Sequence, residues 1–154
     1  MSLKEQVYSV LVVSAADNFN SALKDLLPES KYHPVHTVSN ISTAKRIVAE
    51  RVFDYVIVNS PLPDDNGTHF AVDVCAGKCT VVLLFVRNDV YAQVFNKVAE
   101  HGVFVLPKPT TKPTTIQALD WMASARERLR RFEKKSLSIE EKMEEIRLVN
   151  RAKW

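Results

Sequence analysis

Five apolar runs with strand character alternate along the chain with segments of helical periodicity, and this alternation limits the possible fold more than any other feature. The run at 53–59 is almost continuously apolar, as expected for a strand that is buried on both faces. We expect strands at 7–13, 32–38, 53–59, 80–86 and 103–106. We expect helices at 19–27, 40–52, 70–76 and 89–101. A last helix should open at Thr114-x-x-Gln117, which has the form of a capping box.

This order of elements defines the fold class. Strands that alternate with helices predict a parallel sheet with helices on both faces and right-handed crossovers. We therefore predict an α/β, flavodoxin-like (βα)5 doubly wound parallel sheet with strand order 2-1-3-4-5. A C-terminal helical extension or coiled coil should follow it. The predicted domain covers 6–123, and the helical segment covers 124–154, which contains neither Pro nor Gly.

Composition excludes several classes of protein. No apolar stretch approaches the roughly 20 residues of a transmembrane helix, so we expect a cytoplasmic protein without a membrane partner. Cys75 and Cys79 form a lone C-x3-C without further ligands at suitable spacing, which predicts reduced thiols and no metal site. No nucleophile–base pair, Walker loop or G-x-G-x-x-G is present. We therefore expect a protein that is not an enzyme and needs no cofactor.

Two short segments at strand ends carry the most specific pattern in the chain. The loop NSPLPDDNG (59–67) has the form D-x-x-x-P-x-x-D/N-G, with Asn59 in place of the first Asp, and VLPKP (105–109) ends the fifth predicted strand. In this order within a (βα)5 pattern, the segments resemble the receiver domain of bacterial two-component response regulators. The resemblance covers roughly residues 6–128 and implies a role in signal transduction.

The receiver family uses a fixed set of residues at the ends of its strands. An acidic pair after the first strand binds Mg²⁺, an aspartate ending the third strand accepts the phosphoryl group, and a Thr or Ser and a Lys contact that group. Aligned strand end to strand end, the acidic pair falls on Ser14 and Ala15, and the phosphoacceptor falls on Asn59. The hydroxyl residue falls on Phe85, and the lysine falls on Lys108, which alone keeps the family's residue.

These substitutions predict a degenerate pocket that is not phosphorylated. Acyl-phosphate formation needs an anionic oxygen nucleophile, which an amide does not provide, and Mg²⁺ is held by carboxylate oxygens. The family's aromatic switch position falls on Val105. Lys108 then either hydrogen-bonds carbonyl oxygens, including that of Asn59, or preserves the turn at its Lys-Pro step. As an alternative, a nearby carboxylate such as Asp17 or Asp64 replaces Asn59 as the phosphoacceptor.

The C-terminal segment has a heptad pattern. A frame that starts at Met122 places mostly apolar residues at its core positions, although Ser136 interrupts it. This pattern predicts a homodimer through the C-terminal helix. The predicted dimerisation residues are Met122, Leu129, Phe132, Ile139, Met143, Ile146 and Asn150. Two alternatives stay open: the apolar stripe packs back on the body as an extended last helix, or Ser138-x-x-Glu141 restarts a helix.

The end of the chain carries a second resemblance. The sequence EEKMEEIRLVNRAKW (140–154) is similar to the beginning of the ANTAR module, the RNA-binding output of AmiR- and NasR-type antiterminators, whose signature includes R-A-K. The resemblance implies that Arg147, Arg151 and Lys153 bind RNA and that the chain is a shortened form of a longer regulator. A basic helix supplies the electrostatic part of RNA affinity, whereas the commoner role of such a charge run is a solvated helix face.

Together these observations give one leading hypothesis. The protein is a signal-transduction response regulator with a non-phosphorylatable receiver domain, coupled by a coiled coil to RNA-binding transcription antitermination. A regulatory protein or a small molecule of unknown identity would control it. One alternative is a conventional, phosphorylation-dependent two-component response regulator, and the other is a dimerisation module without RNA output.

Overall fold

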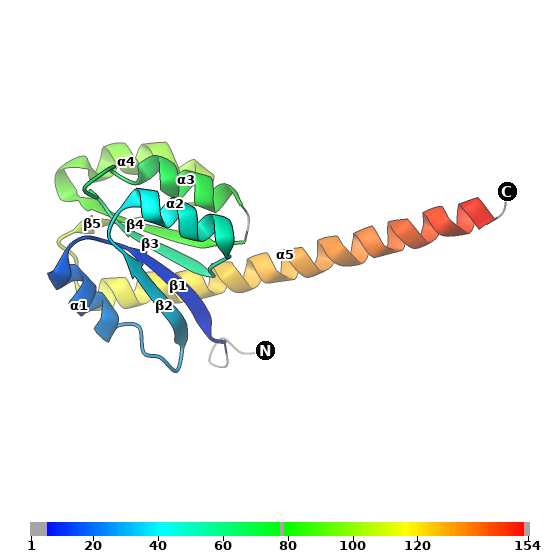
Figure 1. Ribbon diagram of the computed structural model, residues 1–154, viewed down its shortest axis with the longest axis horizontal. Helices are drawn as coiled ribbons and strands as arrows, with labels where there is room; N and C mark the ends of the chain where they lie inside the picture. The colour runs from blue at the N-terminus through cyan, green and yellow to red at the C-terminus, as the bar shows by residue number, and fades with distance from the viewer. Residues whose placement is uncertain (1–5, 78, 153–154) are drawn as a thin grey trace.

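A five-stranded parallel sheet forms the centre of the protein (Figure 1). The structure is a computed structural model that describes the backbone of residues 6–77 and 79–152 and the side chains of residues 6–77 and 79–133. The strands are β1 (Tyr8–Val13), β2 (Tyr32–Val38), β3 (Tyr55–Asn59), β4 (Val81–Arg87) and β5 (Phe104–Lys108). Their order, β2-β1-β3-β4-β5, confirms the predicted flavodoxin-like topology.

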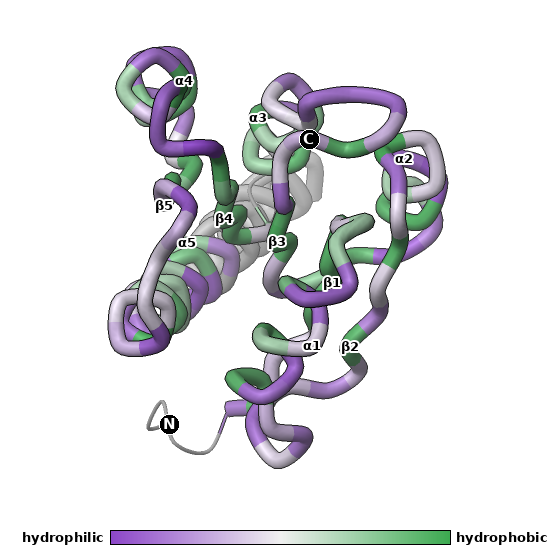
Figure 2. Tube along the Cα trace, turned by 90° about the vertical axis from the view of Figure 1, so that its left-hand side faces the viewer, coloured by the Kyte–Doolittle hydropathy of each residue, from purple (hydrophilic) through white to green (hydrophobic). Residues whose placement is uncertain are grey.

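Helices cover both faces of this sheet. They are α1 (Asp17–Asp25), α2 (Ile41–Glu50), α3 (Thr68–Ala76), α4 (Tyr91–Val98) and α5 (Lys112–Ala152). Two 3₁₀ turns, η2 (Asn88–Val90) and η3 (Ala99–His101), flank α4, so the helix expected at 89–101 is divided into three pieces. Figure 2 shows α1 and α5 on one side of the strands and α2, α3 and α4 on the other.

The alternation of side chains along the strands divides the core into two parts. In β3, Tyr55 and Ile57 pack with α1 and α5, whereas Val56 and Val58 pack with α2, α3 and α4. All residues of β3 are buried, as the apolar run at 53–59 predicts for a strand covered on both faces. The same alternation decides which face of the sheet the polar residues at the strand ends occupy.

The last helix begins earlier than predicted and runs without a break. The Thr111 hydroxyl accepts a hydrogen bond from the Thr114 backbone N–H at 3.2 Å, so Thr111 caps the helix and the capping box predicted at Thr114 is wrong. The helix then continues for 41 residues through Ser138, where the sequence allowed a restart. Its second half projects away from the body of the protein as a single rod (Figure 1).

The predicted dimerisation residue Met122 is instead part of the core. Its side chain is fully buried among Tyr8, Leu83 and other residues on the α1 and α5 side of the sheet. Leu129 is half-buried and packs against the same cluster, whereas Phe132 is 56% exposed. The heptad frame failed at Met122 because a helix that lies on a sheet uses the same spacing of apolar residues as a helix that pairs with another helix.

The position of Met122 leads to a test of this correction. We expect Met122→Ala to lower the free energy of unfolding by about 2–4 kcal/mol, because truncating a fully buried side chain leaves a cavity. Urea denaturation followed by circular dichroism measures the change. Ile116→Ala on the same helix is the matched control, because Ile116 is 45% exposed and its truncation should cost less than about 1 kcal/mol. Equal losses in the two variants would contradict the assignment of Met122 to the core.

Asp54 fixes the middle of α5 at the amino-terminal edge of the sheet. This residue directly precedes β3, and its Oδ2 accepts a hydrogen bond from the Ser9 backbone N–H at 3.0 Å. Its Oδ1 accepts from Arg126 Nε at 2.8 Å and from Arg130 Nη2 at 3.2 Å. The side chains of Asp54 and Arg126 are only 16% and 9% exposed, so this ion pair is largely removed from water.

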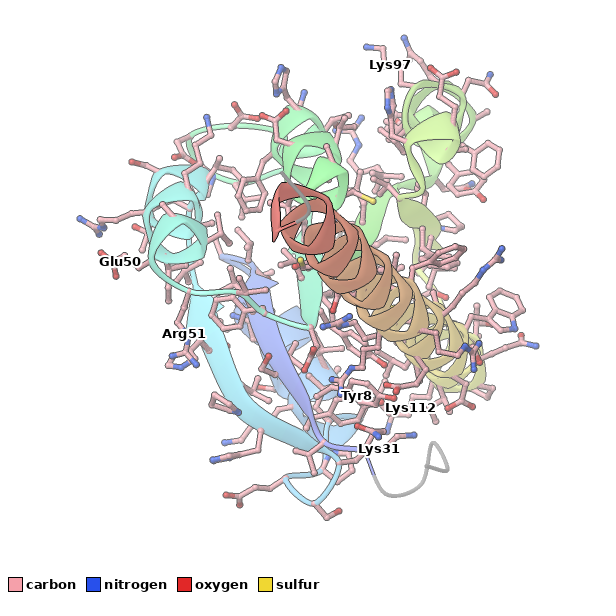
Figure 3. The ribbon with its side chains drawn as sticks, turned by 90° about the vertical axis from the view of Figure 1, so that its right-hand side faces the viewer. Tyr8, Lys31, Glu50, Arg51, Lys97 and Lys112 are labelled. Atoms are coloured by element: carbon pink, nitrogen blue, oxygen red, sulfur yellow. The ribbon has the colours of Figure 1, made fainter. Side chains whose placement is uncertain are left out.

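A second contact fixes α5 at the same position along the sheet. The Tyr8 hydroxyl donates to Glu127 Oε2 at 2.9 Å, and the Tyr8 ring lies beside the helix (Figure 3). Burial, followed by this hydrogen bond to Glu127, raises the pKa of Tyr8 above its ordinary value. The helix is therefore attached to the body as far as the turn that contains Arg130. Among the described residues, no helix combines the length and the apolar character that a membrane span requires.

Candidate functional site at the carboxyl edge of the sheet

The polar residues that were predicted from the strand ends lie together. Ser14 follows β1, Asn59 ends β3 and Lys108 ends β5, and all three side chains belong to the sheet face that α1 and α5 cover. Asn59 pairs with Phe85 in the register of β3 with β4. Ser14 and Asn59 are 1% and 5% exposed, so the centre of the site is closed to bulk water.

A chain of hydrogen bonds joins these residues. The Lys108 ammonium donates to Asn59 Oδ1 and to the Ser60 carbonyl oxygen, both at 2.6 Å. Asn59 Nδ2 donates to Ser14 Oγ at 3.2 Å, and Ser14 Oγ also lies 3.3 Å from the Ala16 backbone N–H. The amide therefore accepts from the cation on one side and donates to a hydroxyl on the other. The structure shows the predicted bonds of Lys108 to carbonyl oxygens. Its peptide bond to the following proline is cis, and the second explanation, a preserved turn at the Lys-Pro step, stays open as well.

The electrostatics of the site are unusual for a lysine at the end of a strand. Both oxygens that Lys108 contacts are neutral, and within the described part of the chain the lysine forms no ion pair. Burial lowers the pKa of Lys108, and the nearby charge of Arg87 lowers it further. The lysine that the receiver family also has is thus kept, and its hydrogen-bond acceptors are neutral oxygens instead of carboxylates.

Phe85 takes the position of the family's hydroxyl residue and belongs to the core. Its ring is 1% exposed and meets Phe19 of α1 edge to face, with 5.0 Å between the ring centroids. Phenylalanine has no donor for a phosphoryl oxygen, and the contact with Phe19 holds the ring in place. Val105 at the aromatic switch position is buried on the opposite face, in the core under α2, α3 and α4.

The carboxylates nearest in sequence have other partners or lie at the surface. Asp64 accepts hydrogen bonds from the backbone N–H groups of Ile41 and Ser42, at 2.9 and 3.0 Å, and so caps the first turn of α2. These two bonds are the main reason why the pKa of Asp64 lies below its ordinary value. Asp17 is exposed at the start of α1. The cap formed by Asp64 was not foreseen, because it joins segments that are distant in the sequence.

The backbone conformation of the same loop explains why residue 67 is a glycine. Its φ is +82°, and a Cβ atom at this position would come within 2.8 Å of Val58 Cγ1. Only glycine satisfies both conditions without strain. The glycine of the loop motif therefore shapes the turn from β3 into α3 and does not indicate chemistry by itself.

The residues present do not fit a receiver's Mg²⁺ ion. The positions of the acidic pair hold a hydroxyl and a methyl group, the acceptor position holds an amide, and Lys108 occupies the carbonyl oxygen of that amide. Mg²⁺ binding by proteins depends on carboxylate oxygens. In the parts of the chain with described side chains, no three or more His, Cys, Asp or Glu residues are grouped so that they could hold a metal ion.

Comparisons with solved structures identify proteins that have a similar fold. No protein-family model and no curated protein sequence matches the chain. A signal receiver domain of an HD domain-containing protein from Pseudomonas fluorescens Pf-5 superposes with a TM-score of 0.70 at 20% identity, over 87% of this chain and 96% of that one. The receiver domain of HemR from Leptospira biflexa gives 0.66 at 27% identity, over 75% and 94%. The chemotaxis response regulator CheY4 of Vibrio cholerae gives 0.65 at 20%, over 76% and 99%.

The class of fold follows from these superpositions. The solved structures are response-regulator receiver domains, and this chain has the same five-stranded parallel sheet with the same strand order. The chain therefore has the receiver fold. At the positions onto which the strand-end alignment places the family's acidic pair, phosphoacceptor and hydroxyl residue, this chain has Ser14, Ala15, Asn59 and Phe85.

Proposed function

We propose that this protein is a signal-transduction regulator whose receiver-like domain works without phosphorylation and whose C-terminal helix carries the output. One observation supports this most strongly: Lys108, Asn59 and Ser14 form a closed hydrogen-bond chain where a phosphoacceptor and its Mg²⁺ ligands would lie. The receiver fold and the 27% identity to the HemR receiver domain support a role in signalling. The protein acts by binding, without an enzymatic step or a cofactor, and a regulatory protein or a small molecule supplies its input.

The proposal makes a direct prediction about phosphotransfer. Acetyl phosphate with Mg²⁺ should leave the protein unmodified, because Asn59 offers no anionic nucleophile and its amide is hydrogen-bonded to Lys108 and Ser14. Intact-mass spectrometry checks the result. A conventional regulator would instead gain the mass of one phosphoryl group.

The output is proposed to pass through a homodimer of α5. Beyond Glu133 the backbone of this helix runs away from the body (Figure 1), and helices that stand alone in water are marginally stable. The side chains of Trp121 and Phe132, which precede the projecting part, are 54% and 56% exposed. The receiver domain of NtrC4, a structure with TM-score 0.61 at 22% identity over 79% of this chain and 98% of that one, was solved as a dimer.

The proposed dimer contact begins where the helix leaves the sheet. Met122 is excluded from it, and Leu129 lies at the transition because it still packs against the core. Phe132 is the first exposed apolar residue of the heptad frame. The remaining predicted contact residues, Ile139, Met143, Ile146 and Asn150, have side chains outside the described residues, and for them dimerisation stays a proposal.

A pair of double variants tests the homodimer. Ile139→Glu with Ile146→Glu should convert a dimer to a monomer at micromolar concentrations, because four negative charges would meet at core positions of the coiled coil. Ser138→Glu with Leu148→Glu adds the same charge outside the heptad core and should leave the dimer intact. Light scattering coupled to size exclusion measures both masses. A monomeric wild-type protein, or equal masses for the two double variants, would refute the proposed contact.

RNA binding is the proposed final step of the output. Arg147, Arg151 and Lys153 lie beyond the described side chains. The support for their role is the similarity of 140–154 to the start of the ANTAR module, together with the excess of 10 Lys/Arg over 6 Asp/Glu in residues 124–154. Affinity for hairpin RNA should fall steeply with salt, because contacts with phosphates release counterions. A dimerisation module without RNA output would bind no RNA at any salt concentration.

A further inference from the structure

A hollow opens between the loop after β3 and helix α4, and it adjoins the Lys108–Asn59–Ser14 chain through Ser60, whose carbonyl oxygen accepts from Lys108. It has a volume of about 330 Å³. Three of its lining residues are apolar, and the others are Ser60, Asn66, Thr68, Arg87, Gln93 and Lys97. The hollow therefore combines two cations with hydroxyl and amide groups above an apolar floor, and none of the described residues that line it is acidic.

The two cations are available to a ligand. Arg87 donates from Nε and Nη2 to Asp89 at 3.1 and 2.6 Å, but both side chains are 63% exposed. Exposed ion pairs of this kind contribute little stability, so an incoming anion can compete with Asp89. Lys97 is exposed on α4 (Figure 3) and forms no ion pair with any residue whose side chain is described.

A third cation adds to the positive potential of this region. The Lys108 ammonium donates to the carbonyl oxygen of Ser60 at 2.6 Å, and Ser60 also lines the hollow. Arg87 and Lys108 are partners in the register of β4 with β5, and the charge of Arg87, after burial, lowers the pKa of Lys108. An anion placed beside Ser60 would relieve the repulsion between them.

We propose that this hollow binds a small organic phosphate without covalent attachment. Arginine and lysine, together with hydroxyl and amide donors, match the several acceptor oxygens of a phosphate ester. The apolar floor suits the organic part of such a ligand, and the volume lies at the small end of the range for ligand pockets. The site is distinct from the Asn59 position, so it does not depend on the absence of phosphotransfer or on RNA output.

A bound phosphate would connect two segments of the fold. Ser60 and Asn66 belong to the loop between β3 and α3, and Gln93 and Lys97 belong to α4. A ligand that contacts both sets would hold α4 against the loop. Its binding energy would then favour one position of α4 over others.

Calorimetric titration of the full chain with phenyl phosphate at constant ionic strength tests the proposal. We expect one saturable site, and we expect Arg87→Gln and Lys97→Gln each to weaken binding at least about fivefold, because each removes a charge-assisted hydrogen bond. Lys24→Gln on α1 is the matched control, because Lys24 is an exposed cation outside the hollow and its loss should not change the affinity. The absence of saturable binding, or equal affinities in all three variants, would overturn the proposal.

A fourth variant separates binding from a merely structural ion pair. Asp89→Asn removes the carboxylate that competes for Arg87, so it should tighten phenyl phosphate binding, whereas Arg87→Gln should weaken it. If Arg87 and Asp89 served only to stabilise the end of β4, the two variants would change binding in the same direction. Weaker binding by Asp89→Asn would therefore also count against the site.

Discussion

Replacement of Asp54 with alanine is expected to lower the free energy of unfolding by about 3 kcal/mol, because the buried Arg126 guanidinium loses its shortest ion pair and keeps the longer one with Glu133 at 3.5 Å. Asp54 holds Arg126 at 2.8 Å and Arg130 at 3.2 Å, and the Arg126 side chain is only 9% exposed. The Ser9 backbone N–H would also lose its acceptor. Thermal and urea denaturation measure the loss, and we expect α5 to loosen from the amino-terminal edge of the sheet.

Asp120→Ala provides the matched control on the same helix. Asp120 pairs with Lys31 at 3.7 Å, and its side chain is 62% exposed. An exposed pair of this geometry contributes from zero to about 1 kcal/mol. If Asp54→Ala cost no more than Asp120→Ala, Asp54 would not be the anchor of α5.

The stabilisation by Asp54 should depend on pH with a defined sign. Burial alone raises the pKa of Asp54, but the hydrogen bond from the Ser9 backbone and the ion pair with Arg126 outweigh it, so the pKa lies below the ordinary value of 3.8. A carboxyl whose pKa is lowered by folding stabilises the protein above its unfolded pKa and loses this effect as the pH falls through the folded value. The difference in stability between wild type and Asp54→Ala should therefore be constant near neutrality and shrink below about pH 4.

The contacts of Asp54 limit how α5 can move relative to the sheet. The helix is capped by Thr111 at one edge of the sheet and held by Asp54 at the other. The projecting half therefore continues from a fixed direction, and a change of position in α5 must break the contacts of Arg126 and Arg130. Variants of Asp54 are expected to uncouple the C-terminal segment from the domain before they unfold it.

The sequence predicts the framework of the protein because local patterns specify it. The bounds of β2 agree with the prediction, and those of the other strands lie within two residues of it. The convergence of Asn59, Ser14 and Lys108 was also predictable, because the carboxyl ends of parallel strands meet at one edge. The alignment of strand ends with the receiver family was sufficient to identify these positions.

Apart from the local errors at Thr114 and in the helix expected at 89–101, the errors and omissions concern contacts between distant segments. Met122 satisfies a heptad and a sheet-facing helix equally well, and only the packed structure distinguishes them. The pairs Asp54–Arg126 and Asp64–Ile41 join segments 72 and 23 residues apart. No short-range pattern marks such partners. The phosphate-binding hollow likewise depends on how α4 lies beside the β3–α3 loop.

The second large expected effect concerns phosphorylation at the Asn59 site. In the receiver family the aspartate that ends the third strand is the phosphoacceptor, whereas we expect no covalent modification of this protein. The amide of Asn59 accepts from Lys108 and donates to Ser14, and the Asp64 carboxylate is bound to the first turn of α2. Asp17→Asn and Asp64→Asn variants complete the experiment, since they identify the acceptor if one exists.

The most direct measurement is the intact mass of the wild-type protein after incubation with acetyl phosphate and Mg²⁺, beside the two Asp→Asn variants. A closed, neutral amide site without Mg²⁺ ligands predicts one unchanged mass for all three proteins. A wild-type species heavier by one phosphoryl group, lost in Asp17→Asn or Asp64→Asn, would show that a neighbouring carboxylate does the chemistry of the missing aspartate and would contradict the account.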